Sequence, residues 1–278
     1  MASVSSPIRK FVKPILYKLM GPRCYEWFQY YGKLRDIKSR LVEEAEMELL
    51  PYFVKKNSIT IDVGANFAYY TVRMAELCPQ GKVYAFEPIP ATYATAKKIV
   101  EHFALPNVEL FKKGVGEKNQ IMSFEVPLQE LGTHSAGQAH MKGRNNDMLG
   151  KEKYHNFQLH ESFDCEVVAL DIFFPNLNSL DFIKIDIEGA ELFALRGMKY
   201  LLERHKPVVL LEICSFFLEG FGIKEKELLE FIASIQFDLY AYNQEKKKLE
   251  KQLTFPLADK NYILIHQSNK HLYQKIIE

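Results

Sequence analysis

The chain has 278 residues, of which 47% are hydrophobic, and a chain of this size can bury roughly three quarters of its unfolded surface as one domain. Its 36 Lys and Arg nearly balance its 35 Asp and Glu, which gives a net charge of +1. We therefore expect no nucleic acid partner, because such proteins favour a strongly basic surface. Four widely spaced cysteines indicate reduced thiols, and no apolar run is long enough to span a membrane, so we expect a cytoplasmic protein.

Residues 1–56 are expected to form a helical extension. Apolar side chains between residues 8 and 20 fall on one helical stripe surrounded by Lys and Arg. We expect this helix to pack on the main domain or on a second copy of the chain in a homodimer. A less favoured alternative is peripheral contact with an anionic membrane surface. A second helical pattern runs from Lys33 to Leu50 and is expected to stop at Pro51.

Residues 57–268 alternate short apolar runs with helical patterns, which is typical of βαβ units. The expected strands are Ile59–Val63, Lys82–Phe86, Val108–Phe111, Phe182–Asp186, Val208–Ile213, Phe237–Tyr242 and Tyr262–His266. The expected helices are Tyr69–Leu77, Ala91–Phe103, Ala190–Leu202 and Lys224–Ile235. The pattern predicts an α/β fold with a doubly wound, seven-stranded, mostly parallel sheet. Residues 127–163 interrupt this pattern and are expected to be a substrate lid, and residues 269–278 are expected to form a C-terminal helix.

The first motif, residues 61–71, joins a buried strand to a helix. Asp62 follows the apolar run, and Gly64 marks a sharp turn before the helix. Ligands of open α/β sheets bind at this edge, where the N–H groups at a helix start hold an anion, and Asp62 can accept from a ligand's ammonium group. The alternative is that Gly64 only supplies a tight turn and Asp62 caps the helix. Asn66 and Ala68 interrupt the glycine pattern that a dinucleotide fingerprint requires.

The second motif is Glu87 followed by Pro88, at the end of the next expected strand. Glu87 lies 23 residues after Gly64, and an acidic residue with this spacing is suited to accept hydrogen bonds from both hydroxyls of a ribose. Pro88 ends the strand. The alternative is a surface carboxylate at a strand end, which is much less favoured beside the first motif.

The third motif runs from residue 182 to residue 191 and brings acidic residues to the same edge. Asp186 ends the expected strand, where its carboxylate could bind the cofactor amine, a metal or a substrate hydroxyl. Glu188 and Glu191 lie at the start of the next helix, and the alternative for both is that they only oppose the helix dipole. Glu212 closes the following strand in the same way and is a weaker candidate.

Taken in order, the three motifs resemble the FkbM-type methyltransferase family. The resemblance covers Ser58–Ile213 and rests on Asp62-Val63-Gly64-Ala65-Asn66, Phe86-Glu87-Pro88 and the block from Lys184 to Glu191. It implies a Rossmann-like class I fold, S-adenosylmethionine as cofactor, and O-methylation of a hydroxyl on a sugar or natural product. It implies that the block from Asp62 contacts the methionine part and Glu87 the ribose, and the expected cofactor-binding residues are Asp62, Gly64, Ala65, Asn66, Tyr70, Thr71, Glu87, Pro88 and Asp186. One departure is Ala68, where the family usually has glycine.

Methylation of a hydroxyl also needs a base for its proton, and the candidates are Asp186 and His134. The insert carries four of the chain's eight histidines: His134, His140, His155 and His160. Their spacing matches no standard zinc arrangement, so we expect no metal. The expected acceptor is a small molecule or a saccharide. The alternatives are an NAD-dependent oxidoreductase and a non-catalytic cofactor-binding protein, and the absence of Pro-Cys and Asp-Pro-Pro-Tyr runs disfavours nucleic acid methylation.

Overall fold

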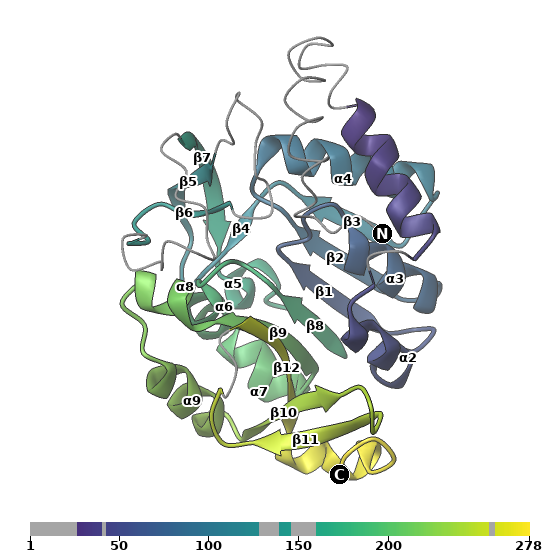
Figure 1. Ribbon diagram of the computed structural model, residues 1–278, viewed down its shortest axis with the longest axis vertical. Coiled ribbons are helices and arrows are strands. Elements are labelled where there is room, and N and C mark those ends of the chain that lie inside the picture. Colours follow the sequence, from purple (N-terminus) through teal and green to yellow (C-terminus); the bar gives the residue numbers. More distant parts are fainter. Residues whose placement is uncertain (1–26, 41–42, 128–138, 146–159, 256–258) are drawn as a thin grey trace.

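An eight-stranded sheet forms the middle of the structure (Figure 1). The computed structural model describes residues 27–40, 43–127, 139–145, 160–255 and 259–278. The strand order is β11-β10-β12-β9-β8-β1-β2-β3. The strands are β1 (Ile59–Val63), β2 (Lys82–Phe86), β3 (Val108–Phe111), β8 (Phe182–Ile185), β9 (Val208–Cys214), β10 (Phe237–Asn243), β11 (Lys248–Gln252) and β12 (Asp259–His266).

Most of this sheet is parallel, as the sequence predicts. Strands β3, β2, β1, β8 and β9 pair in parallel, whereas β12 is antiparallel to its neighbours β9 and β10. The expected α/β class with a mostly parallel sheet is confirmed, with one strand more than the seven predicted. The additional strand is β11, which pairs antiparallel with β10 at the edge of the sheet.

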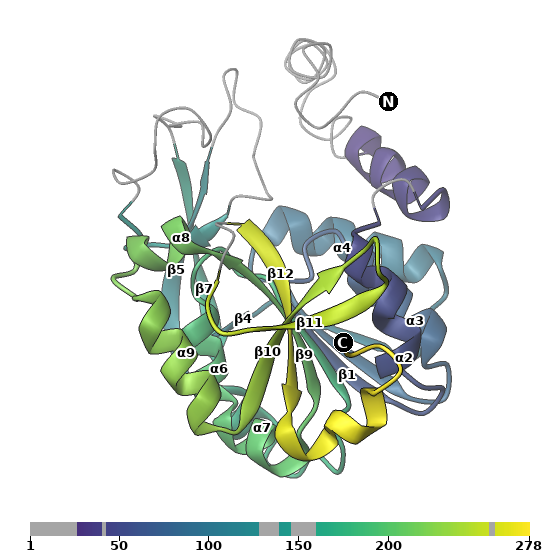
Figure 2. The ribbon, with the colours of Figure 1, turned by 60° about the horizontal axis from the view of Figure 1, so that its bottom comes forward.

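Helices cover both faces of the sheet (Figures 1 and 2). One face carries the 3-10 helix η1 (Ala45–Leu49), α2 (Leu50–Phe53), α3 (Tyr69–Leu77) and α4 (Pro90–His102), and the other carries α5 (Leu170–Phe173), α6 (Glu191–Gly197), α7 (Lys199–His205) and α9 (Glu225–Ser234). Because side chains alternate along a strand, Ile61 and Val63 of β1 pack with α6 and α7. Asp62, between them, faces α3, where the hydroxyl of Thr71 donates to its carboxylate.

A second, four-stranded sheet adjoins the carboxyl ends of the parallel strands (Figure 2). Its order is β4-β7-β5-β6, and its strands are β4 (Gly114–Val115), β5 (Gln120–Pro127), β6 (His140–Met141) and β7 (His160–Val168). The expected insert, residues 127–163, therefore begins at the last residue of β5 and ends within β7. Strands β5 and β7 pair antiparallel from Gln120–Val167 to Pro127–His160, so both ends of the insert are anchored side by side.

The terminal segments differ from the expected helices. The pattern from Lys33 to Leu50 is not one helix: residues 27–38 are helical, and η1 and then α2 follow after a break. Pro51 lies in the first turn of α2 rather than after a helix end, a position that tolerates proline because its missing N–H would have no partner there. The C-terminal segment contains the 3-10 helix η3 (Gln267–Tyr273). The amphipathic segment 8–20 lies outside the described residues, and within the described part of the chain no helix is long and apolar enough to cross a membrane.

Candidate functional site

A cavity of about 230 Å³ lies at the carboxyl ends of β1, β2, β8 and β9. Strand β1 is flanked by β2 on one side and β8 on the other, so the chain order changes direction here, and open α/β sheets bind their ligands at such a point. The residues that line the cavity include Glu44, Gly64, Asn66, Phe86, Glu87, Pro88, Ile89, Lys113, Gly114, Val115, Phe124, Ala139, His140, Met141, Asp186, Ile187, Glu188, Ala190 and Glu212.

The turn after β1 is held tightly against the end of β8. Gly64 has φ +83°, and a Cβ atom there would lie 1.9 Å from the backbone oxygen of Asp186. The N–H groups of Gly64 and Ala65 both donate to the carbonyl oxygen of Phe86, at 3.0 and 2.9 Å. Only glycine allows this approach of two strand ends, so Gly64 fixes the width of the cavity at this point.

Asp62 lies behind the cavity lining rather than in it. Its side chain is buried, and its Oδ2 accepts a hydrogen bond of 2.5 Å from the Thr71 hydroxyl. Burial raises the pKa of Asp62 to about 6, although the Thr71 bond and the nearby Lys184 ammonium lower it. Asp62 therefore orders the turn and α3 through Thr71, while its neighbours Gly64 and Asn66 line the cavity.

The nine predicted cofactor-binding residues thus divide into two groups. Gly64, Asn66, Glu87, Pro88 and Asp186 line the cavity, and Asp62, Ala65, Tyr70 and Thr71 are outside its lining in the described structure. The phenol of Tyr70 donates to Glu44 Oε2 at 2.7 Å. This bond connects α3 to the N-terminal extension.

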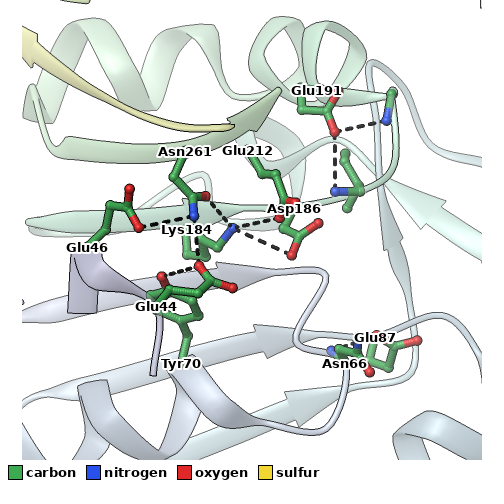
Figure 3. A network of polar contacts seen from close by, with 12 residues as sticks. Glu44, Glu46, Asn66, Tyr70, Glu87, Lys184, Asp186, Glu191, Glu212 and Asn261 are labelled. Atoms are coloured by element: carbon green, nitrogen blue, oxygen red, sulfur yellow. Dashed lines mark hydrogen bonds and ion pairs between the residues drawn. The ribbon is translucent and has the colours of Figure 1, made fainter. Parts of the chain in front are cut away.

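Glu87 joins two turns and still faces the cavity (Figure 3). Its Oε2 accepts from the N–H of Asn66 and its Oε1 from the N–H of Ile89, both at 2.9 Å. Burial raises the pKa of Glu87 to about 7, although these two backbone donors lower it. A carboxylate oxygen has a second lone pair, so Glu87 retains acceptor capacity for the hydroxyls of a bound sugar.

The third motif forms a strained turn after β8. Glu188 and Gly189 have φ of +57° and +104°, and Glu191 Oε1 accepts from the N–H of Gly189 at 3.0 Å and of Ile187 at 3.3 Å. Burial raises the pKa of Glu191 to about 7. Glu191 therefore holds the turn together, and Glu188 and Asp186 are left facing the cavity.

Lys184 is a buried cation inside the third motif, and it is not among the predicted site residues (Figure 3). Its Nζ lies 3.6 Å from Asp186 Oδ2, 3.6 Å from Glu212 Oε2 and 3.4 Å from Asn261 Oδ1. Burial lowers the pKa of Lys184, but the Asp186 and Glu212 carboxylates outweigh burial and raise it. The signal in the sequence was a lysine inside the otherwise apolar strand 182–185, because a fully buried Lys requires an acidic partner.

The second sheet closes the cavity from the other side. Phe124, Ala139, His140 and Met141 contribute to the lining. Arg144 anchors this segment, because its Nη1 donates to the carbonyl oxygen of Glu188 at 3.0 Å and its guanidinium lies 4.2 Å from the Phe217 ring centroid. The insert thus provides one wall of the site.

The structure describes two of the four histidines of the expected insert. His134 and His155 lie outside the described residues, and His160 belongs to β7. His140 is buried, lines the cavity, and has its Nε2 3.8 Å from Glu125 Oε2. In the part of the chain that the structure describes, no group of three or more His, Cys, Asp or Glu residues is arranged to hold a metal ion.

Comparison with known proteins decides the family. The methyltransferase FkbM domain matches residues 62–241, which is more than half of the chain. The chain belongs to the FkbM methyltransferase family. It is therefore an S-adenosylmethionine-dependent methyltransferase, which confirms the predicted family and cofactor. The prediction of an NAD-dependent oxidoreductase as an alternative is not supported.

Individual relatives are distant. The FkbM methyltransferase described here is 28% identical over 185 residues to Methyltransferase 1 of Beauveria bassiana (strain ARSEF 2860), which covers 63% of this chain and 71% of that protein. The solved structure of methyltransferase FkbM from Methylobacillus flagellatus KT is 13% identical with a TM-score of 0.46, covering 86% of this chain and 59% of that chain. SMU.1697c of Streptococcus mutans, solved in complex with SAH, is 13% identical with a TM-score of 0.45, covering 81% and 98%.

The charges of the cavity fit S-adenosylmethionine better than a dinucleotide. Among the described residues, the lining has five carboxyl groups, those of Glu44, Glu87, Asp186, Glu188 and Glu212. Its basic side chains in the same part of the chain are those of Lys113 and His140. S-Adenosylmethionine carries a sulfonium and an ammonium group, whereas NAD carries a pyrophosphate, and like charges disfavour each other at short range. The buried Asn66 Oδ1 has no hydrogen-bond partner in the described structure, so it is available to a ligand donor in the FkbM methyltransferase.

Proposed function

We propose that this FkbM methyltransferase methylates a hydroxyl group of a sugar or another small natural product, with Asp186 as the base. The observation that carries the proposal is the position of Asp186 at the end of β8. Its side chain is about one-third exposed (32%), lines the cavity, and forms an ion pair with Lys184. Its N–H donates to the carbonyl oxygen of Val63 at 3.0 Å, so the backbone of the base is fixed to the turn of the first motif.

The remaining lining residues have roles in binding. Glu87 would accept from the two ribose hydroxyls, and Gly64 and Asn66 would contact the methionine part. S-Adenosylmethionine supplies a methyl group that its sulfonium already activates. The chain's contribution is therefore mostly orientation, which is worth roughly 7–11 kcal/mol when reacting atoms are held near attack distance.

The base supplies the remaining part of the rate enhancement. A hydroxyl is a weak nucleophile until its proton leaves, and a positioned base contributes about 10²–10⁴-fold to the rate. Asp186 is suited to this role, because the cavity wall holds it while part of its carboxyl remains accessible. His134 remains a second candidate from the sequence. The small-molecule or saccharide acceptor, and the expectation that nucleic acid is not a substrate, belong to the same proposal.

A screen of sugars and macrolides with isotopically labelled S-adenosylmethionine tests this function. We expect label on an acceptor oxygen, located by mass spectrometry and NMR, and a loss of about 10²-fold or more in kcat for Asp186→Asn. The control is Asp164→Asn, because Asp164 is exposed on β7 outside the cavity lining of the described structure. Label on a nitrogen or carbon of the acceptor, or full activity of Asp186→Asn with a hydroxyl acceptor, would contradict the proposal.

A further inference from the structure

Three oxygen atoms from three neighbouring strands converge on the ammonium group of Lys184 (Figure 3). Asp186 directly follows β8, Glu212 belongs to β9 and Asn261 belongs to β12. Glu212 and Asn261 are register partners in adjacent strands, and the three oxygens lie 3.4–3.6 Å from Lys184 Nζ. Asp186 and Glu212 also line the cavity, so one fixed cation holds two carboxyl groups in the cavity wall.

One ammonium cannot neutralise two ionised carboxylates. With both ionised, the group would carry a net negative charge in a partly desolvated site, where like charges at short range repel strongly. Burial raises the pKa of Glu212, the Asp186 carboxylate raises it further, and Lys184 lowers it. Glu212 therefore favours its protonated form while it lies beside a second carboxyl group at the same cation.

We propose that Asp186 and Glu212 act as one proton-sharing pair, positioned by Lys184, and that Glu212 is thereby a second residue of the base for methyl transfer. This inference rests on the proposed methylation of a hydroxyl. When the bond between the acceptor oxygen and the methyl group forms, the sulfur–methyl bond of the donor breaks and its electron pair stays on sulfur. The acceptor's O–H bond breaks, its electron pair stays on the oxygen, and the proton bonds to the ionised oxygen of the pair. The pair then holds two protons and returns one to water, since the side chains of Asp186 and Glu212 are 32% and 35% exposed.

The surroundings keep Lys184 in place. The Nδ2 of Asn261 donates to Glu44 Oε2 at 2.8 Å and to Glu46 Oε2 at 3.4 Å, which turns its Oδ1 towards Lys184. The ring of Tyr70 lies 5.2 Å from Lys184 Nζ. Glu44 and Asn261 lie outside residues 62–241 that match the family domain, so the N-terminal extension and β12 of this chain complete the setting of the pair.

Other charged groups face the pair from each neighbouring element. Asp62 is the register partner of Lys184 and contributes negative charge from the adjacent strand β1. Glu44 adds negative charge from the N-terminal side. Burial and the Asp186 carboxylate raise the pKa of Glu188 well above its usual value, although Arg144 lowers it. Arg144 compensates Glu188, with Nη1 3.9 Å from Glu188 Oε2. The acidic surroundings favour retention of the shared proton, and Lys184 is the cation in direct contact with both carboxyls.

Carbon-13 NMR of the side-chain carboxyl groups tests the pair without any acceptor. Glu212→Gln assigns the Glu212 signal, and we expect this signal to titrate in two steps in the unaltered protein. In Asp186→Asn it should titrate in one step, with its pKa lower by about one unit or more, and Asp164→Asn should leave it unchanged. In Lys184→Met its pKa should rise. A Glu212 signal with a single step that Asp186→Asn does not move would overturn the proposal, and this result does not depend on Lys184→Met folding.

The pH dependence of kcat tests the role of the pair in the base. With a hydroxyl acceptor from the screen, we expect kcat of the unaltered protein to change in two steps with pH and kcat of Glu212→Gln to change in one. We also expect kcat of Glu212→Gln to fall at least tenfold while the KM for S-adenosylmethionine stays within about twofold. An unchanged profile in Glu212→Gln would overturn the role of Glu212 and leave hydroxyl methylation intact. Methylation of nitrogen or carbon alone would instead overturn the proposed function, and with it the base.

Discussion

Replacement of Gly64 by alanine perturbs the contact between the first turn and the end of β8. A Cβ atom at this position would lie 1.9 Å from the Asp186 backbone oxygen, 3.0 Å from its carbonyl carbon and 3.1 Å from Ile187 Cγ2. The positive φ of +83° costs a non-glycine residue about 1–2 kcal/mol, and the overlap costs about 1–3 kcal/mol more. We expect Gly64→Ala to lower the free energy of unfolding by roughly 2–5 kcal/mol.

Two other glycines separate these contributions. Gly222 has φ +73° and no atom within 4 Å of its Cβ position, so Gly222→Ala should lose only the conformational part, about 1–2 kcal/mol. Gly81 has a Cβ position 1.9 Å from the Ser58 oxygen, and it directly precedes β2, at the sheet edge opposite to the cavity. Gly81→Ala should therefore reduce stability by overlap without changing the cavity.

Urea unfolding and calorimetric titration with S-adenosylhomocysteine (SAH), the demethylated cofactor, measure the two effects together. We expect Gly64→Ala to bind SAH at least about tenfold more weakly, a loss of roughly 1.4 kcal/mol, because both strand ends that line the cavity must move apart. Gly222→Ala and Gly81→Ala should bind SAH as the unaltered protein does. If Gly64→Ala matched Gly222→Ala in both stability and affinity, the close contact of the strand ends would not shape the site.

Three further predictions concern other parts of the site. Burial raises the pKa of Glu87 to about 7, so the folded protein binds more protons than the unfolded chain between about pH 4 and 7. The thermal stability of the free protein should therefore fall as the pH rises through this window. The affinity for SAH, which needs the Glu87 carboxylate, should rise over the same range. Equal trends in melting and calorimetry would contradict this. Arg144→Met removes the bond to the Glu188 carbonyl and should speed SAH release about tenfold in stopped-flow measurements; an unchanged release rate would mean that the 139–145 segment does not retain the ligand. Tyr70→Phe removes the hydrogen bond to Glu44 and should lower the free energy of unfolding by about 1 kcal/mol without changing the affinity for SAH. A tenfold loss of SAH affinity would instead indicate that Tyr70 contacts the cofactor.

The central strands could be predicted because buried parallel strands are continuous apolar runs that end in turn or acidic residues. The bounds expected for β1, β2, β3 and α3 agree with the structure. Strand β11 could not be predicted in this way, because its sequence, KLEKQ, carries one apolar residue and forms an edge. The helix expected from Ala190 to Leu202 is interrupted between α6 and α7, where a Cβ on Gly197 would lie 1.9 Å from the Gly116 oxygen. Such a contact between distant segments leaves no local pattern.

Part of the site was predictable because the apolar runs of the parallel strands are followed by acidic residues. Glu87 and Asp186 directly follow strands β2 and β8 at the edge where ligands bind, and the structure brings both to the cavity. Strand alternation could also have indicated that Asp62 faces α3, since Ile61 and Val63 belong to the other face. The register that pairs Asp62 with Lys184 is not contained in either segment alone. A lysine inside an apolar strand does indicate a buried cation, but the contact of Lys184 with Asn261, 77 residues further along the chain, could not be derived from the sequence.

Binding of SAH shows whether the cavity holds the cofactor by its ribose through Glu87. Calorimetric titrations with SAH and with NAD should be made on the unaltered protein and on Glu87→Gln. We expect SAH to bind and NAD not to bind, and we expect Glu87→Gln to weaken SAH by about 10–100-fold, since a hydrogen bond to a charged group contributes about 1.5–3 kcal/mol. Binding of NAD in place of SAH, or equal SAH affinity in Glu87→Gln, would contradict the assignment of this cavity.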